Sequence, residues 1–142
     1  MAGIGYGPMG IAKKGETTSI DAAVIDRVIK IPDVAATAAM RILRDQGASG
    51  GTSSGVNLLT SMHIASTAKK PIKSRLTIAT LLADPGHYYD STYYNRDWIA
   101  QKFARHGGLE AYDCWYSVIS ESLASGEDPL FLGYDRCPNG VF

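Results

Sequence analysis

The sequence predicts an α/β fold, in the form of a partial three-layer sandwich whose mostly parallel sheet of few strands is flanked by helices. Two observations favour this fold. Segments with apolar residues at helical spacing alternate with short apolar segments. The longest apolar segment, residues 75–83, has the length and composition of a strand that is covered on both faces. Two or three strands are few for such a sheet, so we expect the 142 residues to be part of a larger protein.

The N-terminal third is predicted to form a loop, a short helix, a short strand and a longer helix. Residues 1–19 are rich in glycine, which is typical of loops. Residues 21–28 have the pattern of a short helix, and residues 28–31 that of a short strand. A clearer helix begins at Pro32, because proline suits the first helical turn. It ends at Gly47, which can adopt the left-handed conformation of a helix end.

The middle of the chain is predicted to place a helix after a very short strand. Residues 48–51 are small and fit a buried strand or a close approach of two segments. Either Ser53 or Ser54 is expected to cap the next helix, which extends to about Lys69.

The C-terminal part is predicted to be helical. Residues 84–86 (Asp-Pro-Gly) form a turn that ends the long strand. Asn95 caps a helix that stops at Gly107. A final helix covers residues 113–124, with its apolar side chains on one face.

Composition and charge exclude several classes of partner. Fourteen acidic and 14 basic side chains cancel, which predicts no binding to nucleic acid or to an anionic membrane. The sequence has no signal peptide and no apolar run of membrane-spanning length, so we expect a cytoplasmic protein; a mitochondrial location stays open for a longer precursor. Cys114 and Cys137 form no Cys-x-x-Cys pair and are expected to be reduced thiols.

Metal and dinucleotide sites are not predicted. The three histidines, His63, His87 and His106, lack the spacing of metal ligands. His87 is a candidate to line a site, because loops after strands bind ligands in α/β proteins. Residues 5–10 match the pattern G-x-G-x-x-G, but no strand precedes them and Pro8 interrupts them, so a nicotinamide site is not expected.

The segment Gly-Gly-Thr-Ser-Ser-Gly, residues 50–55, places a neutral hydroxyl at the start of a helix. A hydroxyl at Ser53 could donate a hydrogen bond to the ring nitrogen of pyridoxal phosphate and leave that nitrogen largely unprotonated. A carboxylate at that place would hold the nitrogen protonated and strengthen the ring as an electron sink. Taken alone, Ser53 is better explained as part of a Ser/Thr-rich helix cap, which is a common feature.

Several spaced motifs together carry a family resemblance. They are residues 3–6 (Gly-Ile-Gly-Tyr), an aspartate-containing turn into a helix, residues 44–47 (Arg-Asp-Gln-Gly), residues 50–55, and residues 82–91 (Leu-Ala-Asp-Pro-Gly-His-Tyr-Tyr-Asp-Ser). In this order the chain resembles the C-terminal half of cysteine synthase and cystathionine β-synthase, which are fold-type-II pyridoxal-phosphate enzymes. The resemblance implies that residues 1–105 belong to the catalytic domain and residues 106–142 form a helical tail.

The resemblance also implies the site residues. Ser53 would face the ring nitrogen of the cofactor, and Asp84 would lie behind the ring, with Gly5 also at the cofactor. The substrate loop would consist of Gly3, Ile4, Gly5 and Tyr6. Two departures from the family pattern affect the anchoring of this loop and the geometry behind the ring, namely Ala2 and the Pro-Gly-His sequence of residues 85–87.

The family's Schiff-base lysine and phosphate-binding loop lie upstream of the matched motifs, and no lysine of this chain matches the lysine motif. The resemblance therefore implies no catalytic residue here, and a fragment that binds pyridoxal phosphate weakly and is inactive alone. The complete enzyme would catalyse β-replacement on an O-activated serine, as a transferase or lyase of cysteine biosynthesis, and would form homo- or hetero-oligomers.

Two alternatives stay open at this point. The chain could be a non-catalytic interaction module that docks on a full-length relative or on a missing half, because a partial sheet leaves apolar faces uncovered. It could also be a relative of the serine/threonine dehydratases, which would use Ser53 in the same way.

Overall fold

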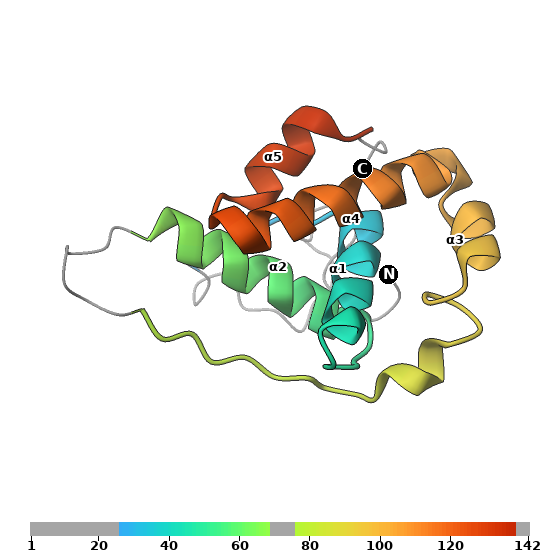
Figure 1. Ribbon diagram of the computed structural model, residues 1–142, viewed down its shortest axis with the longest axis horizontal. Helices are drawn as coiled ribbons and strands as arrows, with labels where there is room; N and C mark the ends of the chain where they lie inside the picture. Colours follow the sequence, from blue (N-terminus) through green and yellow to red (C-terminus); the bar gives the residue numbers. More distant parts are fainter. Residues whose placement is uncertain (1–25, 69–75, 139–142) are drawn as a thin grey trace, which may run out of the picture.

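Helices connected by extended segments and turns make up the described part of the chain. The computed structural model describes residues 26–68 and 76–138 (Figure 1). The helices are α1 (Asp33–Asp45), α2 (Thr52–Thr67), α3 (Arg96–Lys102), α4 (Gly108–Ser125) and α5 (Pro129–Arg136), with short 3-10 helices η3 (Gly86–Tyr89) and η4 (Ala104–His106). Within these residues no helix is long and apolar enough to cross a membrane.

The predicted α/β sandwich with a mostly parallel sheet is wrong. Across residues 26–68 and 76–138 no strand is formed, and the one ladder contact is an isolated bridge between Gly50 and Pro85. Residues 76–83, which were expected to be a buried strand, run as an extended segment along the outer edge of the molecule (Figure 1). Leu81 is 78% exposed, and its carbonyl accepts a hydrogen bond from Asn57 Nδ2 at 2.9 Å. An apolar pattern predicts a tendency to be buried, but a sheet also needs a neighbouring strand to pair with.

The shorter expected strands are absent too. Residues 28–31 are not paired, and of residues 48–51 only Gly50 takes part in the bridge. Residues 26–28 are not helical, so the helix expected at 21–28 is not formed in its described part; residues 21–25 lie outside the described residues.

Most helix predictions agree with the structure. Pro32 precedes α1, and Gly47 follows it with a φ of 86°. Asn95 caps α3, because its side chain accepts hydrogen bonds from the backbone N–H groups of residues 97 and 98. Gly107 has a φ of 86° and separates η4 from α4, which is longer than the expected helix at 113–124. The predicted cap of α2 is wrong, since Gly51 holds that place and neither Ser53 nor Ser54 does.

Helices α1 and α2 approach each other unusually closely. Residues Val34 to Met40 of α1 are all buried, and most of them are alanine. Gly55 of α2 faces the carbonyl oxygen of Ala36, and a Cβ atom at Gly55 would overlap that oxygen. The small residues of α1 and the glycine of α2 therefore allow the two backbones to touch.

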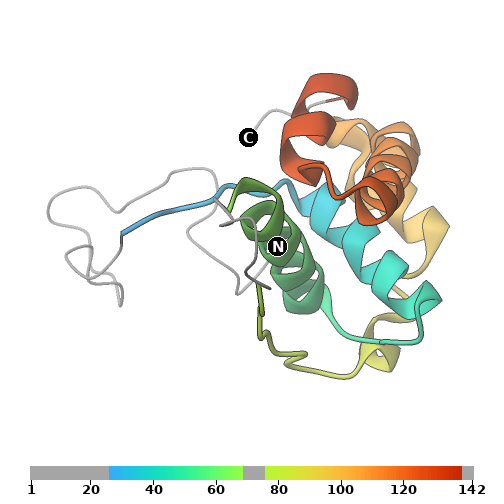
Figure 2. The same ribbon diagram turned by 60° about the vertical axis from the view of Figure 1, so that its left-hand side comes forward.

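The pair α4 and α5 packs against the pair α1 and α2 (Figure 2). Trp115 and Ile119 of α4 are fully buried at the centre of this core. Gly133 of α5 lies against the Trp115 ring, where a Cβ atom would overlap the ring atoms. The contact fixes α5 closely against α4.

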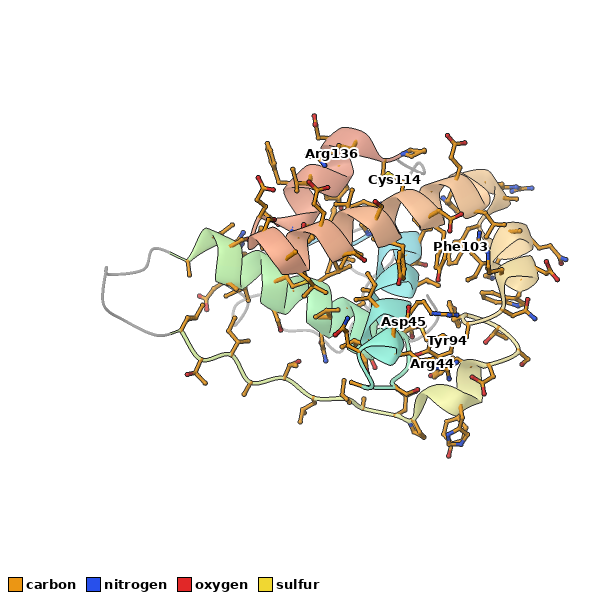
Figure 3. All side chains as sticks on the ribbon, in the orientation of Figure 1. Arg44, Asp45, Tyr94, Phe103, Cys114 and Arg136 are labelled. Carbon is orange, nitrogen blue, oxygen red and sulfur yellow. A yellow bond between two sulfur atoms is a disulfide. The ribbon has the colours of Figure 1, made fainter. Side chains whose placement is uncertain are left out.

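A disulfide between Cys114 and Cys137 attaches the end of α5 to α4, so the expectation of two reduced thiols is wrong. The Cα atoms are 5.6 Å apart, although 23 positions separate the two residues in the sequence. Arg136 next to it forms an ion pair with Glu121 of α4 at 2.8 Å (Figure 3). Spacing along a sequence does not show that two cysteines on different helices meet in space.

The double variant C114S/C137S is expected to be less stable than the parent chain by about 3 kcal/mol, because the cross-link restricts a loop of this length in the unfolded state. Urea unfolding followed by circular dichroism measures the difference in the free energy of unfolding. Dithiothreitol should destabilise the parent and leave the double variant unchanged. Equal stability of the parent with and without reductant would contradict the prediction.

Candidate functional site

The start of α2 meets the turn that precedes η3, and this junction contains two of the predicted cofactor residues. Gly50 and Gly51 are buried immediately before α2. The bridge between Gly50 and Pro85 holds Asp84 beside them. Residues about 30 positions apart in the sequence thus form one site, which we call the Gly51–Asp84 junction.

The glycines of the junction are in contact with polar side chains. A Cβ atom at Gly50 would overlap the hydroxyl of Ser54, and one at Gly51 would overlap the Asp84 carboxylate and the Tyr89 ring. Gly86 lies in the same way against the hydroxyl of Ser49. None of the three glycines has φ in the left-handed region, so the backbone conformation does not require glycine. Glycine is needed at these positions because it has no Cβ atom and therefore allows the close approach.

Two buried oxygen atoms of the junction have no hydrogen-bond partner. They are Ser54 Oγ and Asp84 Oδ1. The other carboxylate oxygen, Asp84 Oδ2, accepts a hydrogen bond from the Tyr89 hydroxyl, and this bond raises the pKa of Tyr89 above its usual value. A buried acceptor without a donor is costly, so these atoms mark a place where a polar ligand group could bind.

The charge of the junction is arranged favourably for a carboxylate. Asp84 lies against Gly51, which is the N-cap of the 16-residue helix α2. The N-terminus of a helix carries a partial positive charge that stabilises an anion. Asp84 thus lies at the helix end that favours a negative charge, with Oδ2 bound by the Tyr89 hydroxyl and Oδ1 without a hydrogen-bond partner.

The structure brings Ser53 and Asp84 to the same end of α2. Ser53 lies in the first turn, is half-buried, and its hydroxyl makes no hydrogen bond within the described part of the chain. Gly3, Ile4, Gly5 and Tyr6 lie outside the described residues. His87 is exposed, and its ring contacts that of Tyr88 at a tilt of 60°, with the centroids 4.4 Å apart.

The sequence did not predict the contacts of the side chains that support the junction. The Tyr94 hydroxyl donates to the carbonyl of Gly50 at 2.8 Å and lies 3.2 Å from that of Met40. The Arg44 guanidinium stacks on the Tyr94 ring at 3.4 Å and forms an ion pair with Asp90 at 2.5 Å (Figure 3). Arg44 and Tyr89 belong to the motifs of the family resemblance, but spacing alone gave no sign of their contacts.

No metal site accompanies the junction. Among residues 26–68 and 76–138, no group of three or more His, Cys, Asp or Glu side chains could hold a metal ion.

The substitution Gly51→Ala is expected to destabilise the chain by about 1–3 kcal/mol, because the added methyl group overlaps the Asp84 carboxylate and the Tyr89 ring. The same substitution in a D84A background should cost clearly less, since one of the overlapping groups is gone. Chemical unfolding of the four proteins of this double-mutant cycle measures the coupling. Equal costs in both backgrounds would show that Gly51 and Asp84 are not in contact.

Comparison with known proteins gives two relatives. The chain is 42% identical over 146 residues to the Caenorhabditis elegans protein named "Putative pyridoxal-phosphate dependent protein F13B12.4", and the match covers 100% of this chain. It is 33% identical over 92 residues, 64% of its length, to "L-cysteine desulfhydrase Cds1" of Mycobacterium tuberculosis. The match covers 33% of the C. elegans protein and 25% of the M. tuberculosis protein. The chain thus spans about a third of the length of the C. elegans relative.

No family model matches the sequence, and no solved structure matches it. The name of the C. elegans relative refers to pyridoxal phosphate, and that of the M. tuberculosis relative refers to L-cysteine.

Proposed function

We propose that this chain supplies the part of a pyridoxal-phosphate enzyme that contacts the cofactor's ring, in an enzyme that acts on cysteine or on an O-activated serine. The observation that carries the proposal is the pair of buried, unpartnered oxygens at the Gly51–Asp84 junction, Ser54 Oγ and Asp84 Oδ1, with Ser53 in the first turn of the same helix. The name of the C. elegans relative supports the same cofactor.

One group of the junction could contact the pyridine ring of the cofactor. The Ser53 hydroxyl has no partner in the described part of the chain and can donate a hydrogen bond to the ring nitrogen. The absence of a Cβ atom at positions 50, 51 and 86 lets Ser54, Asp84 and Ser49 pack closely at the start of α2. When bound, pyridoxal phosphate supplies an electron sink for carbanion chemistry at an amino acid.

The reaction we propose first is β-replacement, as in the cysteine synthases that the sequence resembles. A neutral hydroxyl at the ring nitrogen favours this chemistry over transamination. Cysteine desulfhydration is the second candidate, because the M. tuberculosis relative is named for it. Both reactions cleave the bond between Cβ and its substituent, and both use the same groups of this chain.

We propose that the isolated chain is inactive. No lysine of the chain matches the Schiff-base motif, and the phosphate-binding loop of the family is not recognisable in it. A single hydrogen bond from Ser53 to the ring nitrogen contributes only about 0.5–1.5 kcal/mol. Further protein would have to supply the lysine and the phosphate contacts.

The binding experiment uses 4-deoxypyridoxine 5′-phosphate, which has the ring nitrogen but cannot react with lysines. Equilibrium dialysis should show weak binding to the chain, reduced about two- to tenfold by Ser53→Ala. The matched control is Ser120→Ala, an exposed serine of α4 whose hydroxyl bonds only to its own helix. This control should bind like the parent.

Two outcomes would contradict the proposal. Equal binding by the S53A and S120A variants would remove Ser53 from the ring nitrogen. Stoichiometric fixation of pyridoxal phosphate at one lysine by borohydride would show that the chain carries its own Schiff-base lysine and is not an inactive part.

An interaction module is the alternative that the structure gives a reason to test. Four apolar side chains of the extended segment are between 38% and 78% exposed, namely Leu76, Ile78, Leu81 and Leu82. Exposed apolar side chains that are contiguous along a segment mark contact surfaces. We propose that their partner is a polypeptide equivalent to the other two thirds of the C. elegans relative.

This association is expected to be lost in the double variant L81D/L82D, because two carboxylates would be buried in an apolar contact. Size-exclusion chromatography of the chain mixed with that polypeptide measures the complex. The control variant S120D adds a charge to an exposed position of α4 and should still bind. A mixture in which the parent chain elutes alone would exclude this partner.

A further inference from the structure

A second polar cluster, which consists of Arg27, His63 and Asp128, lies at a groove of about 500 Å³ beside the later half of α2. Its walls come from the extended residues 27–30, from His63 of α2 and from the first two turns of α5. The volume falls in the range of about 300–1,000 Å³ that is usual for small-molecule sites. Ser53 and Asp84 are not among its lining residues, so the groove is separate from the Gly51–Asp84 junction.

His63 connects the two sides of the groove. Its Nδ1 atom is 2.9 Å from Asp128 Oδ2, and its Nε2 atom is 2.8 Å from Arg27 Nη2. A guanidinium has donors only, so Nε2 must accept, and the ring proton must lie on Nδ1 and be donated to Asp128. In this arrangement His63 holds Arg27 by a hydrogen bond.

The polar lining favours an anion. The two oxygens of Asp128 are both engaged, one by His63 and the other by the backbone N–H of Leu130 at 3.0 Å. Arg27 makes one hydrogen bond in the described part of the chain, which uses one of the five N–H donors of its guanidinium. Lys30 adds a second cationic side chain to the same groove. The unused donors of Arg27 suit a carboxylate, which accepts hydrogen bonds from a guanidinium in pairs.

The rest of the lining is apolar and exposed. Val28 is 65% exposed and Phe131 is 72% exposed, and both line the groove. The two side chains form an apolar surface next to the cationic Arg27. An apolar group of a ligand would remove these two side chains from water while its charged end stays at Arg27.

We infer that the groove binds an organic carboxylate with an apolar tail of about the size of a medium-length acyl chain. The carboxylate lies on the Arg27 guanidinium, and the tail lies against Val28 and Phe131. His63 is a positioning residue, because it holds the guanidinium in the groove and does not touch the ligand. This site does not depend on the proposed cofactor function.

The test titrates the 142-residue chain with octanoate, octan-1-ol and acetate by isothermal calorimetry. Octanoate is expected to bind saturably and about tenfold more tightly than octan-1-ol, because the charged hydrogen bonds add to the apolar contact. Acetate, which has no tail, should bind more weakly than octanoate. The variant Arg27→Gln should reduce the affinity for octanoate to that for octan-1-ol.

The matched control is Arg105→Gln, which removes the same charge from an exposed position of η4 and should leave octanoate binding unchanged. His63→Gln should retain the preference for octanoate, because its amide can accept from Arg27 and donate to Asp128. His63→Leu should lose this preference and still bind octan-1-ol, which a general loss of structure would not produce.

Three results would overturn the inference. They are octanoate binding no more tightly than octan-1-ol, acetate binding as tightly as octanoate, and equal effects of the R27Q and R105Q variants.

Discussion

The contact between Gly55 and the Ala36 carbonyl is the constraint on which the arrangement of the other helices depends. The two helix backbones touch there, so α2 cannot shift outward without losing the contact, and any side chain at position 55 would separate the helices. Helix α1 packs on α2 with one face and on α4 with another, which is why its residues Val34 to Met40 are all buried. The positions of α2 and α4 are therefore both set by the small residues of α1.

The Gly51–Asp84 junction depends on the same contact through Tyr94. Its hydroxyl bonds to the carbonyl of Gly50, and it lies beside the end of α1, where Arg44 covers its ring. The segment before α2 and the segment before α3 are thus held to one helix end. This explains how Asp84 keeps its place beside Gly51, although no sheet holds the two segments together.

The helices could be predicted from the sequence because their signals are local. A proline at the start of α1, an asparagine cap at α3 and a glycine after α1 each act on residues within one turn. The sheet could not be predicted in this way, because the apolar pattern of residues 76–83 reports composition and contains no information on a pairing partner. The Cys114–Cys137 pair and the Tyr94 contacts were missed for the same reason, since each joins residues that are far apart in the sequence.

The residues of the candidate site were chosen from the sequence, and their role at a cofactor stays a prediction; their geometry could not be predicted. The motif around Ser53 and the turn at Asp84 were both recognised, and the structure places them at one end of α2. What the sequence could not indicate is that Asp84 has one oxygen bound by Tyr89 and the other unpartnered. These facts follow from how closely Gly51 allows the two segments to approach.

Helix α2 carries a polar cluster at each end, and this has a consequence for how the two sites relate. Ser53 lies in its first turn, and His63 lies ten residues later, about 15 Å along the helix axis. Gly55, which fixes the helix against α1, lies between them. A ligand that displaced α2 at the groove would have to break the Gly55 contact before the movement reached Ser53. Closely packed cores resist such gradual displacement, so the two sites should act independently as long as α1 and α2 stay in contact.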